Sequence, residues 1–344
     1  MSDRSRQPSS EQALLSVRHL TTEFHLAGKQ VARALEDVSF DVLPGQTIGL
    51  VGESGCGKTT TLMSIMRLLP SNGRIIAGQV YFKGHDLLTF SEREMRAHRW
   101  KDMAIVFQCA MNALNPVLKI GDQIREAILL HDVMEREAAE QRVDELLELV
   151  GIPRSRRNQY PYQYSGGMRQ RAMIAMALAC SPDLLFADEP TTALDVMIQA
   201  QVLELLKHIQ EKLGLAIVLV THDLGVVAEM CDTVVVMYGG KVAEYGSAEL
   251  VYNQPQHPYT QRLLESFPDL NRSTNAGQEL ATIPGTPPRL NALPPGCRFN
   301  PRCLKAMEVC AQIAPELMSV APSGSGILHR AACHLLQGTE IAES

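Results

Sequence analysis

A glycine-rich segment near position 55 carries the residues best suited to phosphate chemistry. It reads G-x-x-x-x-G-K-[ST] over residues 52–59, after an apolar run at 48–51 and before a predicted helix at 60–69. Its glycines allow backbone N–H groups to converge on a polyphosphate, Lys58 can reach the β- and γ-phosphates, and the Thr59 hydroxyl can face Mg²⁺. A turn without a ligand is the alternative, but the flanking strand and helix favour nucleotide binding. The predicted contact residues are Gly52, Glu53, Ser54, Gly55, Cys56, Gly57, Lys58, Thr59 and Thr60.

Two carboxylates follow another apolar run. Residues 184–187 are continuously apolar, and Asp188 and Glu189 come directly after them. Beside a phosphate-binding loop, Asp188 would hold Mg²⁺ through water, while Glu189 would polarise the attacking water. Without that loop, the same residues would be an ordinary strand followed by an acidic turn.

A second anion site is predicted at Ser165-Gly166-Gly167, before an alanine-rich helix that we expect to run to about Cys180. Free N–H groups and the helix dipole face outward at such an N-terminus. A plain helix N-cap is the competing interpretation. The position shortly before the strand that ends in Asp188 and Glu189 favours the anion site.

Composition limits the classes of protein that fit. A chain of 344 residues with 45% hydrophobic content predicts about two domains with a real core. A net charge of −6 argues against a broad nucleic-acid surface, so no nucleic-acid partner is expected. The start of the chain lacks an apolar signal, and no apolar stretch approaches the ~20 residues that span a bilayer. We therefore expect a soluble, cytosolic protein without a transmembrane segment, connected to any membrane through a partner.

The pattern along the chain predicts an α/β fold. After a polar tail at 1–13, residues 14–268 alternate apolar runs with helical periods, and a mostly helical subdomain at about 92–164 continues into the helix after Ser165. One predicted helix spans 135–150, and another spans 196–213 between the N-cap Asp195 and Gly214. Most of the predicted strands are continuously apolar, as parallel strands covered on both faces are. The strands are expected at 47–51, 104–107, 184–187, 216–220 and 233–237.

A small cysteine-containing extension is predicted at 269–344, after a polar linker at 271–277 and a proline-rich stretch at 284–295. Its thiols have the spacing C-x5-C-x6-C-x22-C, unlike the paired C-x2-C of structural zinc sites. Four thiolates can hold a [4Fe–4S] cluster or Zn²⁺, or they can remain free. These four are Cys297, Cys303, Cys310 and Cys333, whereas the other cysteines, Cys56, Cys109, Cys180 and Cys231, are expected to be isolated buried thiols.

In the order of its motifs the chain resembles the ATP-binding cassette (ABC) superfamily, and so is expected to be a P-loop NTPase cassette with a helical subdomain. Residues 52–59 resemble the Walker A loop, 165–170 the signature and 184–189 the Walker B segment. Gln108 resembles the Q-loop glutamine, 193–195 the D-loop and His222 the switch histidine.

This resemblance implies a role for each residue. Thr59, Gln108 and Asp188 would surround Mg²⁺, Glu189 would be the general base, and His222 would contact the γ-phosphate. Phe24 would stack on adenine, although a core phenylalanine is an open alternative. Ser165, Gly166, Gly167, Gln170 and Asp195 would complete the ATP site with a facing cassette.

Within the superfamily the chain resembles the ATPase subunits of oligopeptide/dipeptide importers. The resemblance rests on Phe107-Gln108 with 111–116, on His257-Pro-Tyr-Thr260, and on 296–303 with Cys310 and Cys333-His334. Cys109-Ala110 departs from it, because that subfamily usually has Asp-Pro in this membrane-subunit contact. Members with an iron–sulfur cluster at the C-terminal cysteines favour [4Fe–4S] over Zn²⁺.

The implied protein hydrolyses ATP with Mg²⁺ to drive peptide uptake, at the cytoplasmic face of the inner membrane. Its implied partners are a second homologous ATPase subunit, two transmembrane permease subunits and an extracytoplasmic solute-binding protein. Other readings stay open: the same machine for nickel, opines or oligosaccharides, a non-transport ABC ATPase acting on ribosomes or DNA repair, or a redox-sensing module. The complete hydrolytic set favours the importer.

Overall fold

The computed structural model describes residues 13–108, 113–131, 133–192, 194–266, 283–320 and 328–337. The chain divides into two compact units. Unit 1 comprises Met1–Leu43, Thr47–Leu88 and Thr221–Ser344, and unit 2 comprises Pro44–Gln46 and Thr89–Val220. Several sequence features lie outside the described residues, namely the N-terminal tail up to Gln12, Cys109 to Asn112, Ala193 and the linker at 271–277.

Unit 1 contains an antiparallel sheet with the strand order β2-β1-β4-β5. Strand β2 alternates buried and more exposed positions over much of its length, as expected for a sheet with one face on a core, whereas β1 is mostly buried. The helix α1 is joined to this sheet by a hydrogen bond of 2.9 Å between the hydroxyls of Ser64 and Thr22 of β1. The bounds are β1 Leu15–His25, β2 Val31–Val42, α1 Lys58–Ile65, β4 Gly73–Phe82 and β5 His85–Asp86.

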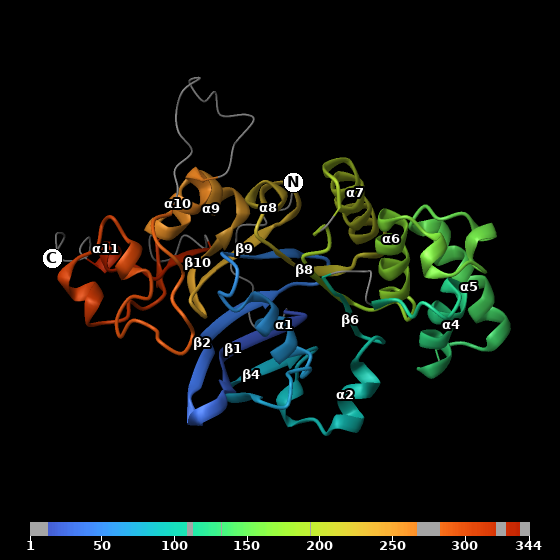
Figure 1. Cartoon of the computed structure of the whole chain (residues 1–344), viewed down its shortest axis with the longest axis horizontal. Helices are drawn as coiled ribbons and strands as arrows, with labels where there is room; N and C mark the ends of the chain where they lie inside the picture. The colour runs from blue at the N-terminus through green and yellow to red at the C-terminus, as the bar shows by residue number, and fades with distance from the viewer. Residues whose placement is uncertain are drawn as a thin grey trace, which may run out of the picture. The chain divides into compact units, whose positions relative to one another are not determined.

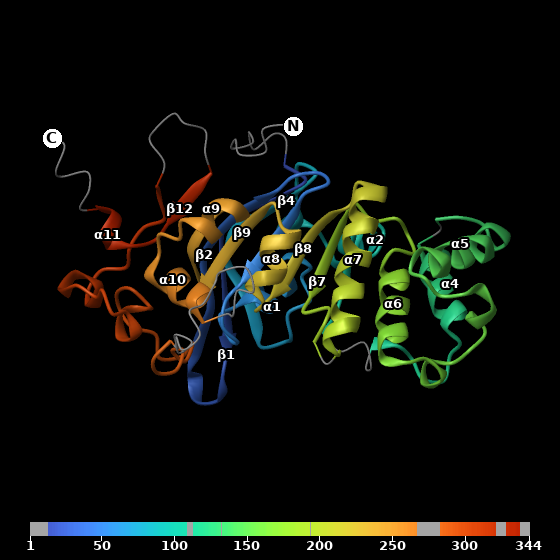
Figure 2. The ribbon, with the colours of Figure 1, turned by 90° about the horizontal axis from the view of Figure 1, so that it is seen from above.

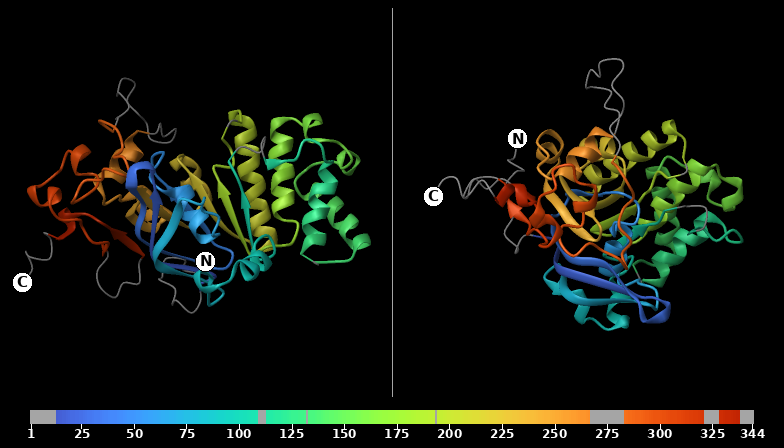
Figure 3. Two further views of the ribbon diagram at one scale, coloured as in Figure 1. Left: turned by 60° about the horizontal axis from the view of Figure 1, so that its bottom comes forward. Right: turned by 60° about the vertical axis from the view of Figure 1, so that its left-hand side comes forward.

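A second sheet of unit 1 runs in the order β11-β12-β10-β9-β3. The strands β3 and β9 are parallel, continuously apolar and fully buried, as predicted. The C-terminal strand β12 adds antiparallel to β10, so the extension continues the sheet (Figure 3). The bounds are β3 Thr47–Val51, β9 Thr233–Tyr238, β10 Lys241–Ser247, β11 Met318–Ser319 and β12 His329–Ala331.

Short helices complete unit 1. Of these, α1 starts two residues earlier than the sequence predicted and ends four residues earlier. It starts after Gly57, whose φ is 109°, and it cannot continue through Arg67, whose φ is +52°. The other helices are α8 Leu224–Met230, α9 Ala248–Asn253, α10 Pro258–Glu265 and α11 His334–Gln337, with 3-10 turns at Ala27–Lys29, Leu87–Thr89, Asn300–Arg302 and Glu308–Ala311.

Unit 2 is built on the parallel strands β6 Met103–Val106, β7 Leu184–Asp188 and β8 Ala216–Thr221, with β7 in the middle. The helix α7 spans Val196–Leu213 as predicted. Its N-terminus is capped by Asp195, whose Oδ1 accepts a hydrogen bond from Ile198 N at 3.0 Å, and Gly214 ends it with a φ of 65°.

Three other helices of unit 2, α4, α5 and α6, form a cluster in which they contact one another (Figures 1 and 2). The helix α6 ends at Ala177, before the predicted end near Cys180, and the chain then turns through Ser181 with a φ of +56°. The bounds are α2 Glu92–His98, α4 Ile120–Leu130, α5 Arg136–Leu149 and α6 Gly166–Ala177, with 3-10 turns at Arg154–Arg156 and Pro161–Gln163. Among the described helices, none combines the length and hydropathy needed to span a lipid bilayer.

His257 connects α10 to strand β10 through hydrogen bonds. Its backbone N–H donates to Glu244 Oε2 of β10 at 2.9 Å, and its ring Nδ1 accepts from Tyr259 N at 3.0 Å. Burial lowers the pKa of His257 to about 4, although the nearby Glu244 carboxylate opposes that shift. The imidazole is therefore neutral in the folded protein near neutral pH, where it serves as a helix cap.

We predict that His257 makes folding stability depend on pH in the acidic range. The unfolded chain takes up a proton at His257 near pH ~6.5 and the folded chain only near pH 4, so stability falls as the pH drops through that interval. The contribution is about 3 kcal/mol at its largest. In His257→Asn, which keeps a capping acceptor and cannot titrate, urea unfolding should show a flatter pH dependence. Equal slopes in both proteins would contradict the assignment.

Candidate active site

The phosphate-binding loop at 52–59 connects β3 to α1 in unit 1. A Cβ added to Gly52 would lie 2.2 Å from Met237 O, and one added to Gly57 would lie 2.8 Å from Ala34 O. Both positions therefore exclude side chains because strands β9 and β2 lie against them. Ser54 and Gly55 are exposed at the turn of the loop, where a ligand can reach the backbone.

Lys58 lies over the backbone of the loop. Its Nζ donates to Gly52 O at 2.6 Å and to Glu53 O at 3.2 Å, and only 6% of the residue is exposed. Carbonyl oxygens are weaker partners for an ammonium than charged phosphate oxygens. The Lys58 ammonium thus lies next to the place where the sequence predicts phosphates. Thr59 is exposed in the first turn of α1 and Thr60 is half-buried beside it.

Glu53 connects the loop to the C-terminal extension, a role that the sequence did not reveal. Its carboxylate accepts two hydrogen bonds from the Arg302 guanidinium, at 2.6 and 3.0 Å. Its backbone N–H donates to the Tyr259 hydroxyl at 2.9 Å. Tyr259 and Arg302 lie in the two C-terminal segments that carry the importer resemblance, and that was the only signal available.

Two other predicted residues belong to unit 1. His222 is exposed and lies between the end of β8 and α8, directly before the N-cap Asp223. Phe24 lies on β1 beside Gly73 of β4, where an added Cβ would be 2.9 Å from its ring. Packing against Gly73 accounts for the ring position without a ligand, and its partial exposure leaves one side accessible.

In unit 2 the structure brings Gln108 and Glu189 together. Gln108 Nε2 donates to Glu189 Oε2 at 2.8 Å, and Thr192 Oγ1 donates to the same oxygen at 2.9 Å. Glu189 has a φ of +43°, a strained conformation for a non-glycine residue that recurs at functional sites. Asp188 is buried at the carboxyl end of β7. The hydrogen bonds fix the orientation of the Glu189 carboxylate.

The predicted signature residues also lie in unit 2. Ser165 caps α6 by accepting a hydrogen bond from Met168 N at 3.3 Å. A Cβ on Gly167 would lie 2.7 Å from a methyl group of Ile198, so this glycine lets α6 approach α7 closely. Gln170 is only 4% exposed, and its Nε2 lacks a hydrogen-bond partner among the described residues. In this structure Gln170 therefore packs inside the unit.

The C-terminal thiols lie near one another. Cys297 N donates to Cys310 O at 2.8 Å. Burial, together with the charge interactions of the other three cysteines, raises the pKa of Cys333 to about 11. Within the described ranges, no group of three or more His, Cys, Asp or Glu side chains has the arrangement of a metal site. The donor set suits a cluster chemically, but its thiols do not converge here.

The expected oxygen ligands of Mg²⁺ are the Thr59 hydroxyl, the Gln108 amide and the Asp188 carboxylate, a donor set that this hard cation prefers. Thr59 belongs to unit 1, whereas Gln108 and Asp188 belong to unit 2. Cys56, Cys180 and Cys231 are buried and unpaired by disulfides, as predicted for isolated thiols.

Comparisons with known proteins agree with this motif set, which defines a P-loop ATPase. The ABC transporter family model matches residues 35–192, and the model described as "Oligopeptide/dipeptide transporter, C-terminal region" matches 243–310. The dipeptide transport ATP-binding protein DppD of Bacillus subtilis is 52% identical over 88% of this chain and 90% of its own length. The oligopeptide transport ATP-binding protein OppD of Salmonella typhimurium is 45% identical over 92% of this chain and 93% of its own.

Comparison with solved structures also indicates an ATP-binding cassette. A dimeric ATP-binding cassette in a post-hydrolysis state, bound to ADP and Pi, matches with a TM-score of 0.61 and 28% identity. That match covers 68% of this chain and 98% of the other. The chain belongs to the ABC transporter family of ATP-binding proteins.

Removal of the loop lysine should weaken nucleotide binding. Lys58→Ala deletes a charge-assisted contact to the phosphates, so we expect the affinity for Mg-ATP to fall roughly 10- to 100-fold by calorimetry. Lys305→Ala, which removes an exposed lysine from the same unit, is the matched control and should bind as the unaltered chain does. Unchanged affinity in Lys58→Ala would refute the phosphate assignment.

Proposed function

We propose that this chain is the ATP-hydrolysing subunit of a membrane ABC importer that energises uptake of di- and oligopeptides. The observation that carries the proposal is similarity extending beyond the cassette, into the C-terminal region that resembles oligopeptide/dipeptide transporters. Relatives named for dipeptide and oligopeptide transport align over about nine tenths of the chain.

The proposed chemistry is transfer of the γ-phosphoryl group to water. Lys58 and the backbone of the loop bind the phosphates, and Thr59, Gln108 and Asp188 hold Mg²⁺. The metal supplies charge neutralisation when bound. Glu189 accepts the proton of the attacking water, and its hydrogen bonds from Gln108 and Thr192 hold the carboxylate in one orientation.

Several further residues take roles in the same proposal. His222 contacts the γ-phosphate, and Phe24 stacks on adenine. Ser165, Gly166 and Gly167 offer the N-terminus of α6 to the ATP of a facing cassette, with Gln170 and Asp195 supporting that surface. Their support is the motif order in the chain together with the capped helix at Ser165.

The proposed assembly contains a second homologous ATPase subunit, two transmembrane permease subunits and an extracytoplasmic solute-binding protein. The chain would lie peripherally on the cytoplasmic face of the inner membrane. Pull-down of the tagged chain from solubilised membranes should recover permease subunits, and a peptide-loaded binding protein should stimulate ATP hydrolysis by the reconstituted complex. Recovery of ribosomes, or stimulation only by nickel, opines or oligosaccharides, would replace peptide import with that alternative.

Glu189→Gln should separate nucleotide binding from hydrolysis. The amide is nearly isosteric but cannot accept the proton, so we expect ATP affinity to persist while turnover falls about 10²–10⁴-fold in phosphate-release assays. Glu145→Gln, an exposed position in the same unit, is the control and should hydrolyse normally. Near-normal turnover in Glu189→Gln would remove Glu189 from the role of general base.

We also propose that Cys297, Cys303, Cys310 and Cys333 hold a [4Fe–4S] cluster, with Zn²⁺ as the alternative. The support is the four-thiol donor set and the backbone hydrogen bond that joins Cys297 to Cys310. The anaerobically purified chain should be brown with a visible sulfur-to-iron absorption band, and Cys303→Ser should lose it. A colourless protein with one zinc per chain would favour the alternative, and a metal-free one would favour free thiols.

A further inference from the structure

Arg302 stands out among the polar side chains of unit 1 because the phosphate-transfer chemistry does not use it, yet it reaches the phosphate-binding loop. The residue lies 249 positions beyond its partner Glu53 in the sequence. The Arg302 side chain is only 5% exposed, and the Glu53 side chain is 24% exposed. A largely desolvated bidentate pair of this kind fixes geometry more strongly than a surface pair does.

Each of the three nitrogens of the Arg302 guanidinium donates a hydrogen bond. Its Nη1 and Nη2 groups donate to the two oxygens of Glu53, and Nη1 also donates to the Tyr238 hydroxyl at 3.1 Å. Its Nε donates to Pro284 O at 2.7 Å. Burial alone would lower the pKa of Arg302, but the hydrogen bonds to Glu53 and Tyr238 outweigh it and raise the pKa. A side chain whose nitrogens all donate hydrogen bonds has little freedom to move.

Glu53 connects Arg302 to the backbone of the phosphate-binding loop through hydrogen bonds. Its N–H is bound by the Tyr259 hydroxyl, and its carbonyl accepts hydrogen bonds from Lys58 Nζ and Cys56 N, both at 3.2 Å. Every polar group of Glu53 therefore contacts either the loop or a residue that braces it. Displacing the carboxylate would disturb the backbone that presents N–H groups to a polyphosphate.

A packed aromatic cluster supports the same contact. The Tyr238 ring lies 4.6 Å from Tyr259 and 5.2 Å from Phe299, measured between ring centroids. These rings come from β9, α10 and the extension. Packing in this cluster holds the rings of Tyr238 and Tyr259, and so positions the two hydroxyls that accept hydrogen bonds from Arg302 Nη1 and from Glu53 N.

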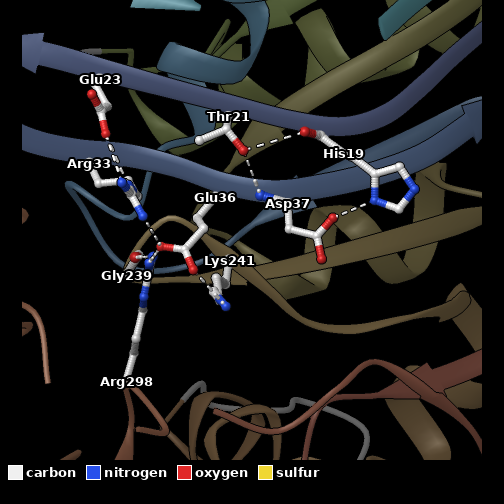
Figure 4. A network of polar contacts seen from close by, with 9 residues as sticks. All are labelled: His19, Thr21, Glu23, Arg33, Glu36, Asp37, Gly239, Lys241 and Arg298. Carbon is white, nitrogen blue, oxygen red and sulfur yellow. Dashed lines mark hydrogen bonds and ion pairs between the residues drawn. The ribbon is translucent and has the colours of Figure 1, made fainter. Parts of the chain in front are cut away.

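A second arginine of the extension reaches the turn beside the loop. Arg298 donates to Gly239 O and to Glu36 of β2, and Glu36 also accepts from Lys241 at 3.0 Å (Figure 4). In that turn Gly240 N donates to Cys56 O at 2.8 Å. The extension thus contacts both Glu53 and the turn that supports the loop at Cys56.

We propose that Arg302 is a positioning residue for ATP binding, which holds Glu53 and thereby keeps the backbone of 52–58 in the conformation that receives the phosphates. This inference rests on the proposed function and assigns the extension a part in the nucleotide site. A purely structural Arg302 would stabilise the fold without changing nucleotide affinity.

The test is a double-mutant cycle on the full chain, measured as Mg-ATP affinity by calorimetry. Arg302→Met and Glu53→Gln should each weaken binding roughly tenfold, and the double variant should bind no more weakly than either single one, because both changes break one contact. Arg302→Lys keeps the charge but loses the bidentate geometry, and should restore part of the affinity. Hydrogen exchange at 52–58 should accelerate in Arg302→Met.

Arg18→Met is the matched control, because Arg18 also pairs with a carboxylate in the same unit: its Nη2 donates to both oxygens of Asp41, at 2.7 and 2.9 Å. It should lower the melting temperature while leaving ATP affinity within about twofold. Folded Arg302→Met with unchanged affinity, or fully additive effects, would overturn the inference. If Arg302→Met does not fold, Glu53→Gln and Arg302→Lys decide alone, and normal binding by both would overturn it. Failure of the unaltered chain to bind Mg-ATP would instead overturn the proposed function.

Discussion

This site depends on close backbone contacts between the phosphate-binding loop and two neighbouring strands, which leave no room for a side chain at either Gly52 or Gly57. Gly52 lies against a carbonyl of β9 and Gly57 against a carbonyl of β2, at distances that no Cβ could tolerate. The sequence suggested that these glycines serve the approach of a ligand. In the structure the protein already requires them, since strands from two sheets of unit 1 define the curvature of the loop.

Local patterns predicted much of the fold. Continuous apolar runs identified β3 and β9 to within one residue, and Asp195 with Gly214 marked both ends of α7. These signals are reliable because burial and capping act within a few residues of chain. The C-terminal end of α1 was missed because Arg67 adopts a positive φ, which cannot be predicted from its residue type.

The candidate site was predictable only in part. Motif order singled out Lys58, Gln108 and Glu189, and the structure shows, beyond that prediction, that the last two are hydrogen-bonded to each other. No local pattern could show that Glu53 is held by Arg302, since that contact joins distant segments whose approach depends on the tertiary fold. The same limit applies to Gln170, whose burial is decided by packing within unit 2 and not by its neighbours in sequence.

The antiparallel addition of β12 to β10 bears on how this chain is made. A ribosome releases β10 well before it has synthesised His329–Ala331, so the nascent protein passes through a stage in which one edge of that sheet has no strand beside it. Open edges of this kind invite pairing with other chains. Premature termination or proteolytic trimming ahead of β12 would therefore leave this edge of β10 open to pairing with other chains.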